Sequence, residues 1–274
     1  METALLMLGG GVAAGLFGSL LGLGGGVLIV PLLTLGFNLP VRDAVGVSLV
    51  CVIVNSGASA GIFLERRTAN LRLGMLLELF TASGAILGGL VAFVLAPRFL
   101  AGLFAALLVY VALSMLRQSR PAEAPDAAIE APVAAVEDRA WIALLSGTDY
   151  RIRNLPAGFA GSILAGVASA LLGIGGGLVK VPVMHLVMGV PLRVATATSN
   201  LMIGITASTS AWVYLLHGGI DPFATGPMAI GVFVGATGGS RIAPRVDVRA
   251  LRSLFAAVLL YTAWEMLQRA VAPA

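Results

Sequence analysis

The chain carries the stretch GLFGSLLGLGGGVLIVP at residues 15–31 and a second copy, GVASALLGIGGGLVKVP, at residues 166–182. The copies align without a gap at an offset of 151 residues, and the similarity extends as far as Leu116 and Leu267. Internal repeats in a very apolar chain are typical of secondary transporters, whose sites form where glycine or proline interrupts a helix in each half. The repeat therefore predicts a membrane protein built from two related halves.

Composition supports a membrane location independently of the repeat. Residues of the AVILMFWYC group make up 58% of the chain and charged residues 11%, whereas soluble domains carry about 25% charged residues. A water-soluble fold of 274 residues cannot bury that much apolar surface. The net charge of +4 comes from arginines at the ends of apolar segments, which is typical of topology signals. We therefore predict an all-α polytopic membrane protein whose partner is the lipid bilayer and not nucleic acid.

Eight apolar segments are as long, or nearly as long, as the ~20 residues that a spanning helix needs. They are residues 3–22, 44–64, 73–96, 99–116, 155–173, 195–216, 223–240 and 251–267. Two shorter apolar pieces, 24–37 and 175–188, follow the glycine triplets. Each would reach only ~21 Å, which is short of a ~30 Å hydrocarbon core. They either re-enter the membrane or cross it with help from the surrounding protein.

The arginines distinguish between these two arrangements. If the short pieces cross, each half has five crossings, the halves run in opposite orientation, and 13 arginines lie on one side against three on the other. If the pieces re-enter, the halves run parallel and the split is nine to seven. The positive-inside rule favours the first arrangement. We predict two inverted repeats of 4–5 membrane segments each, residues 1–116 and 155–274, with both termini outside the cytoplasm. The Ala-, Pro- and Glu-rich linker 117–154 is predicted to be a flexible cytoplasmic tether.

The two glycine triplets are candidate substrate-binding elements. They consist of Gly24, Gly25 and Gly26 in the first copy and Gly175, Gly176 and Gly177 in the second. A dinucleotide-binding loop is excluded, because the last glycine of G-x-G-x-x-G is replaced by Val27 and Leu178. In a membrane, glycines let the helix break, and the helix that restarts directs unpaired N–H groups and a positive dipole end into the protein, where they could hold an anion. The alternative is that glycine only permits close helix packing, as G-x-x-x-G spacings such as Gly84/Gly88 do.

Lys180 is the only lysine of the chain and lies three residues past Gly177, where the first copy has Ile29. An unpaired charge at membrane depth costs at least ~2.5–3.5 kcal/mol, so such residues usually face a cavity or a partner. A substrate anion would provide that partner. The alternative is a shallow position from which the ammonium group snorkels to the interface.

Polar residues also stand in register on the second apolar segment of each half. These are Ser48 in the first half and Thr198, Ser199 and Asn200 in the second. Their hydroxyl and amide groups could donate hydrogen bonds to an oxyanion. The alternative is bonding between helices, at ~0.6 kcal/mol each. Glu78 could bind a coupling proton, but a position near the interface beside Arg72 is the simpler interpretation.

These residues resemble the TauE/SafE family of sulfite exporters and related anion permeases. The resemblance rests on G-x-G-G-G followed by Val-Pro or Lys-Val-Pro in both halves, and on GVPLRVATATSN at residues 189–200. The first half departs from it with Val45-Gly46-Val47 in place of Thr196-Ala197-Thr198. The resemblance implies transport of small sulfur-containing or organic anions, such as sulfite, thiosulfate or sulfonates, across the bacterial cell inner membrane.

We therefore expect an alternating-access anion permease with no metal and no cofactor. An enzyme is not expected, because H-E-x-x-H and paired carboxylates within one apolar segment are both missing from the sequence. Small-residue ridges permit a homodimer. The alternative function is that of a non-transporting membrane subunit of a larger complex.

Overall fold

The computed structural model describes residues 2–21, 25–65, 69–117, 150–242 and 248–271. All regular structure in these residues is helical, which confirms the predicted all-α class. The first half holds α1 (Glu2–Leu21), α2 (Gly26–Pro31), the π-helical turn η1 (Leu32–Gly36), α3 (Val41–Glu65), α4 (Leu71–Val94) and α5 (Pro97–Arg117). The second half holds α7 (Leu155–Leu172), α8 (Gly177–Pro182), the π-helical turn η2 (Val183–Val187), α9 (Leu192–Leu216), α10 (Pro222–Ile242) and α11 (Val248–Val271).

The two halves repeat the same order of elements. The segments α8, η2 and α9 begin and end 151 residues after α2, η1 and α3. Among the described residues, five helices are long and apolar enough to cross a membrane, namely α1, the first part of α3, α4, α5 and α7. The molecule is therefore a multi-pass membrane protein.

Each glycine triplet ends in a helix start, as predicted. Gly25 and Gly176 precede α2 and α8 with φ of 80° and 76°, a left-handed conformation that glycine adopts without steric penalty. Pro31 and Pro182 close α2 and α8. Because proline has no N–H to continue the α-helical bonding, the chain widens there into the π-helical turns. The predicted short pieces are thus helical segments of 11 residues, 26–36 and 177–187.

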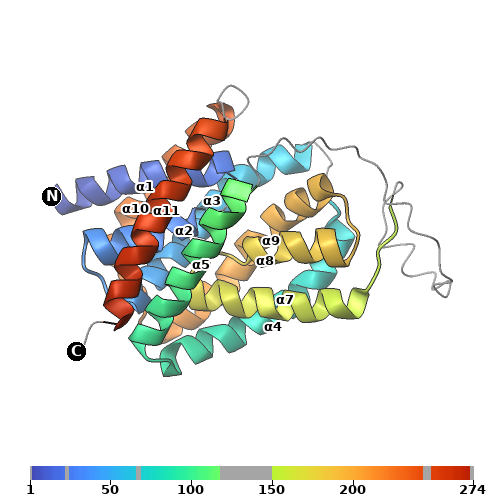
Figure 1. The fold of residues 1–274 in the computed structure, drawn as a ribbon, viewed down its shortest axis with the longest axis horizontal. Helices are drawn as coiled ribbons and strands as arrows, with labels where there is room; N and C mark the ends of the chain where they lie inside the picture. The colour runs from blue at the N-terminus through green and yellow to red at the C-terminus, as the bar shows by residue number, and fades with distance from the viewer. Residues whose placement is uncertain (1, 22–24, 66–68, 118–149, 243–247, 272–274) are drawn as a thin grey trace.

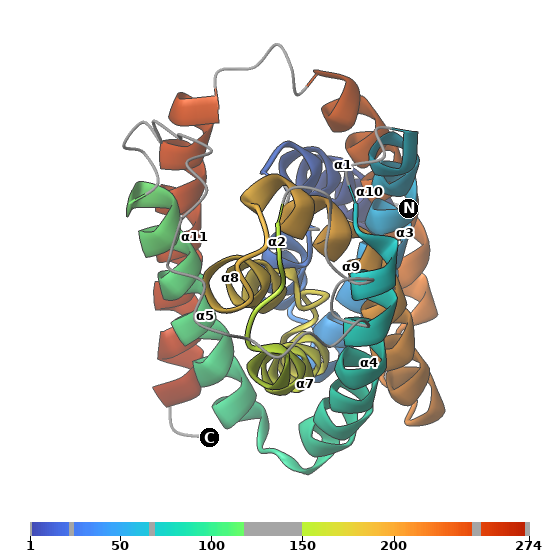
Figure 2. The same ribbon diagram turned by 90° about the vertical axis from the view of Figure 1, so that its right-hand side faces the viewer.

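The short helices lie at the centre and the long ones surround them (Figure 2). Figure 1 shows α1 beside α10 and α4 beside α7, so each half contributes a helix to the other. Glycines make these approaches close, since a Cβ on Gly15 would overlap the backbone of Val232, and one on Gly88 the backbone of Val167. The small residues of α1 and α4 therefore serve the packing of helices within one chain.

Two pairs of helices at equivalent positions in the two halves, α3 with α9 and α5 with α11, run antiparallel. Gly46 of α3 abuts Gly219, just after α9, whereas Ser56 further along α3 abuts Gly204. Likewise Gly102, near the start of α5, faces Ala270, near the end of α11.

Loops from both halves gather at two ends of the molecule. At the first end, Arg42 donates to Leu95 O at 2.9 Å and Phe93 stacks on His217 with ring centroids 4.5 Å apart. At the second end, Asn70 donates to Tyr150 Oη at 2.8 Å and Arg153 N donates to Met188 O at 3.0 Å. The turns 95–96 and 218–221 therefore belong to the first end, and residues 150–154 and 188–191 to the second.

Candidate functional site

Each half has a glycine break between two helices: Gly25 and Gly26 before α2 form the first break, and residues 173–177 between α7 and α8 form the second. The two breaks are in contact at the centre of the fold. Gly26, the first residue of α2, lies against Gly173 and Ile174, and a Cβ at Gly26 would overlap the Gly173 carbonyl oxygen. Ser48 of α3 is fully buried and donates its hydroxyl hydrogen to that carbonyl at 2.8 Å, with the Gly26 carbonyl at 3.4 Å. Ser48 thus joins the break of the second half to the helix start of the first.

The second break is flanked by two buried hydroxyl groups that, unlike the Ser48 hydroxyl, have no hydrogen-bond acceptor among the described residues. Ser199 Oγ lies 3.6 Å from the point where a Cβ on Gly177 would be, and the Ser169 side chain lies beside Gly176. Ser199 is 1% exposed and Ser169 0%. Neither hydroxyl has a hydrogen-bond partner among the residues that the structure describes. Burying a polar group without a hydrogen-bond partner costs ~1–3 kcal/mol, so these two hydroxyl groups are candidate donors to a bound ligand.

Lys180 forms a buried ion pair one turn further along α8. Its Nζ lies 3.0 Å from Glu78 Oε2, on α4. Nζ also donates to Thr206 Oγ1 of α9 at 2.5 Å, and Thr206 Oγ1 lies 2.6 Å from Glu78 Oε1. Lys180, Glu78 and Thr206 are 2%, 6% and 0% exposed. We call these three residues the charged triad.

The charged triad corrects two sequence interpretations. Glu78 does not lie at the interface beside Arg72, because its carboxylate is buried against Lys180. Lys180 does not snorkel, and its partner within the chain is a carboxylate that neither interpretation of the lysine included. The signal available in the sequence was that Lys180 and Glu78 are both single charges within apolar segments, and such charges tend to pair with each other.

The remaining predicted residues occupy different places. Thr198 Oγ1 accepts from Asn70 N at 2.9 Å, at the start of α4. Burial raises the pKa of the neighbouring Tyr150 phenol, so its neutral oxygen accepts from Asn70. The Asn200 carbonyl accepts from Ser56 Oγ at 2.9 Å. Gly175 stays at the second break, where it packs on Ile203 and Val52. Gly25 lies beside Ala14, and Gly24 lies outside the described residues.

The structure therefore gathers only part of the predicted set around the second break. It brings together Gly26, Ser48, Gly175, Gly176, Gly177, Ser199 and Lys180. It adds Ser169, Glu78 and Thr206, which the sequence did not single out as binding residues. Ser199, Ile203 and Thr206 lie one turn apart on one face of α9, and Gly177 and Lys180 of α8 meet that face.

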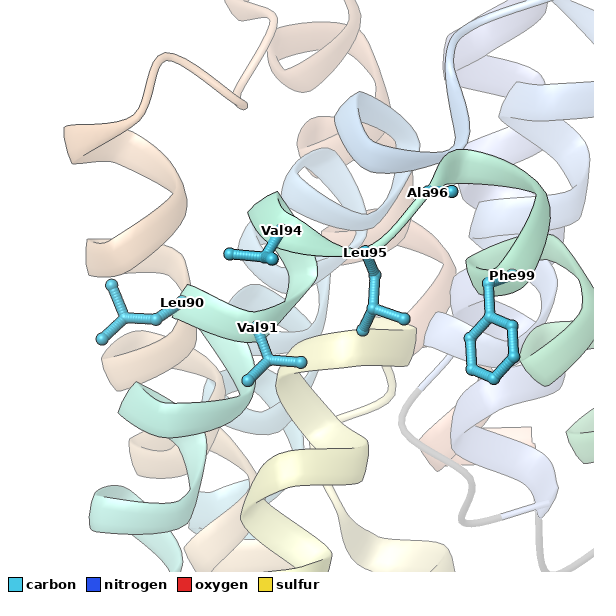
Figure 3. Close-up of a pocket in the computed structure, with 6 residues that line it drawn as sticks. All are labelled: Leu90, Val91, Val94, Leu95, Ala96 and Phe99. Carbon is cyan, nitrogen blue, oxygen red and sulfur yellow. The ribbon is translucent and has the colours of Figure 1, made fainter.

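The groups around the second break are suited to holding an oxyanion. Val179 N and Lys180 N donate to Gly176 O, so the backbone donors that precede the first bonds of α8 are the N–H groups of Gly176 and Gly177. The hydroxyl groups of Ser169 and Ser199 have no acceptor among the described residues, and Lys180 supplies a positive charge. A surface hollow at the turn between α4 and α5 lacks such groups (Figure 3). It is lined by the apolar residues Leu90, Val91, Val94, Leu95, Ala96 and Phe99.

Comparison with known proteins identifies a family of membrane transporters. The model of the sulfite exporter TauE/SafE family matches residues 7–266. A protein named probable membrane transporter protein YunE, from Bacillus subtilis, is 24% identical over 95% of this chain and 96% of its own length. Probable membrane transporter proteins of Xylella fastidiosa and Methanocaldococcus jannaschii are 27% and 26% identical, and the matches cover 96% and 91% of this chain and 96% and 90% of theirs. No solved structure matches the chain significantly.

Proposed function

The chain belongs to the sulfite exporter TauE/SafE family, and we propose that it is a secondary transporter for small sulfur-containing or organic anions such as sulfite, thiosulfate or sulfonates. The substrate is held at the second glycine break, with Ser199 and Ser169 as hydroxyl donors, the N–H groups at Gly176 and Gly177 as backbone donors, and Lys180 as the cation. The observation that carries this proposal is the pair of buried hydroxyl groups, Ser169 and Ser199, that have no partner among the described residues and lie one turn of α8 from the buried Lys180.

The arrangement of the helices supports a transport cycle. Secondary transporters place their sites at the interface of two structural repeats, where broken helices direct their ends at the substrate. Here Gly26 and Gly173, from opposite halves, are in contact. We place the two repeats, residues 1–116 and 155–274, in opposite orientations across the cell inner membrane of a bacterium, with the linker 117–154 in the cytoplasm.

The test is uptake of a labelled anion panel into proteoliposomes that contain the purified protein. The panel consists of sulfite, thiosulfate, sulfate, a sulfonate and a carboxylate. We expect flux of at least one sulfur-containing anion, and a loss of at least about 30-fold in Lys180→Ala, because removing one partner of a buried charge interaction costs 2–5 kcal/mol. Arg98→Ala is the control, since Arg98 is an exposed cation at the start of α5, and should transport as wild type.

Lys180→Ala leaves the Glu78 carboxylate buried and unpaired, so its fold needs a second check. The double variant Lys180→Met/Glu78→Gln removes both charges at nearly constant volume and should fold but not transport. Normal flux in either folded variant would discard the site and keep the function. No flux of any anion from folded wild-type protein would contradict the proposal and favour a non-transporting subunit of a larger complex.

A further inference from the structure

The charged triad limits which charge states of the site are stable. Lys180 and Glu78 together are neutral, and both are almost fully buried. An anion placed beside Lys180 while Glu78 is ionised would bring two negative charges to one positive charge in a site of low polarity. Like charges in a buried site disfavour each other's ionised forms, and a net buried charge is expensive at membrane depth. Anion binding at Lys180 therefore requires that Glu78 lose its charge.

We infer that Glu78 is the proton-binding residue that couples anion transport to proton movement, with one proton carried per anion; this inference rests on the proposed function. In the binding step, a proton from solution adds to a Glu78 carboxylate oxygen and the ion pair with Lys180 opens. The Lys180 ammonium group keeps its charge, and the anion replaces the carboxylate as its counter-ion. On release the proton leaves Glu78 and the ion pair closes again.

Thr206 is placed to serve both protonation states of Glu78. Its Oγ1 lies 2.6 Å from Glu78 Oε1 and 3.0 Å from the carbonyl oxygen of Met202. When Glu78 is ionised, the hydroxyl donates to the carboxylate. When Glu78 is protonated, the hydroxyl can accept from the carboxylic acid and donate to Met202 O instead. Glu78 therefore keeps a hydrogen bond in both states, so the protonated form is not left unsatisfied inside the protein.

No other carboxyl group competes for this role among the described residues that pack against the charged triad. Helix α7 has no ionisable side chain, and α4 contributes Arg72 besides Glu78. Tyr214 of α9 donates to Ala170 O, and His185 Nδ1 of η2 lies 3.0 Å from Val190 O. Arg193 of α9 is a further cation, whose side chain lies outside the described set. The electrostatic partner of Glu78 is Lys180, and that of Lys180 is Glu78.

The stoichiometry of one follows from the repeat. At the repeat offset of 151 residues, Lys180 and Thr206 correspond to Ile29 and Asn55 of the first half, and Glu78 corresponds to Ala229 of the second. None of these three can bind a proton near neutral pH. The chain therefore holds a single copy of the charged triad. A monovalent anion and one proton then move without net charge.

The direct test measures proton uptake when a sulfonate binds to the detergent-purified protein in weak buffer that contains a pH indicator. A sulfonate is used because its own charge does not change near neutral pH. Wild type should take up about one proton per bound anion, and its apparent affinity should fall up to about tenfold per unit rise in pH. Glu78→Gln should bind with no proton uptake and with affinity independent of pH. Glu78→Asp, which keeps a carboxyl group, should retain proton uptake, and Glu265→Gln, the same change on α11, should behave as wild type.

Proteoliposomes separate a failure of coupling from a failure of transport. In wild type, an inwardly directed proton gradient should concentrate the anion inside, and a potassium diffusion potential should not change this accumulation. Glu78→Gln should retain anion exchange and lose gradient-driven accumulation. Exchange in wild type without any response to the proton gradient or any proton uptake would overturn this inference and leave the proposed function intact. Absence of exchange in wild type would overturn both.

Discussion

Ser48 and Ser199 occupy equivalent positions in the two halves, but their hydroxyl groups are engaged differently. Ser48 donates to the Gly173 carbonyl, whereas Ser199 has no partner among the described residues. Ser48→Ala should therefore lower the free energy of unfolding by about 1–3 kcal/mol, because a buried carbonyl loses its donor. Ser199→Ala should not lower the free energy of unfolding, because it removes a buried hydroxyl without a partner among the described residues. It should weaken anion affinity about tenfold or more, because hydrogen bonds to charged groups contribute ~1.5–3 kcal/mol.

Thermal unfolding in detergent and the KM for anion uptake measure the two effects separately. Ser208→Ala on α9 is the matched control, because this exposed hydroxyl donates only to Gly204 O within its own helix, and it should change neither quantity. An unchanged KM in Ser199→Ala would show that the Ser199 hydroxyl does not touch the substrate.

At the level of single residues, the sequence indicated Lys180 and Ser199 but not the partner of the lysine. A single lysine in an apolar segment stands out by composition alone. Its pairing with Glu78 joins residues 102 positions apart, and it depends on how α4, α8 and α9 pack. Ser169 gave no signal either, because a serine on an apolar helix is common and its lack of a partner is a property of the folded protein.

The elements themselves followed closely from the sequence. The predicted segment 195–216 is α9, Leu192–Leu216, and the predicted piece 175–188 is the helix 177–187. Apolar length and glycine and proline positions determine such bounds. The π-helical turns after Pro31 and Pro182 were not predicted, nor was the exchange of helices between halves that sets α1 beside α10. Contacts of that kind depend on side-chain packing between distant segments, which hydropathy does not encode.

The contact between α1 and α10 should be sensitive to single methyl groups at defined positions. A Cβ at Gly15 would overlap the Val232 backbone, so Gly15→Ala must push the helices apart and should destabilise the protein by about 1–3 kcal/mol. Gly9 on the same helix has no neighbour within 4 Å of its would-be Cβ. Gly9→Ala should be neutral or stabilise slightly, because alanine favours helix over glycine by up to ~1 kcal/mol. Unfolding temperatures in detergent compare the two variants, and equal values would mean that α1 does not rely on this close approach.

The whole molecule has an uneven distribution of positive charge between its two ends. Arg72, Arg151 and Arg153 lie at the second end, and Arg66 and Arg67 precede Arg72 by six and five positions in the sequence. The first end has Arg42 and Arg98, and Arg269 donates to Asn38 there. From the positive-inside rule we predict that the second end faces the cytoplasm.

Opposite orientation of the two halves makes a prediction that the parallel arrangement does not share. If the short helical segments complete crossings, the turns 95–96 and 218–221 face the same side. The stacking of Phe93 on His217, the residues that flank these turns, supports this. In the parallel arrangement they would face opposite sides. Single cysteines on a Cys51→Ser background should therefore react with a membrane-impermeant maleimide in intact cells at Ala96→Cys and Pro222→Cys. Arg153→Cys, at the second end, should react only after permeabilisation. Labelling of the first two cysteines from opposite sides would rule out inverted repeats, because no inverted arrangement of these helices separates the two turns.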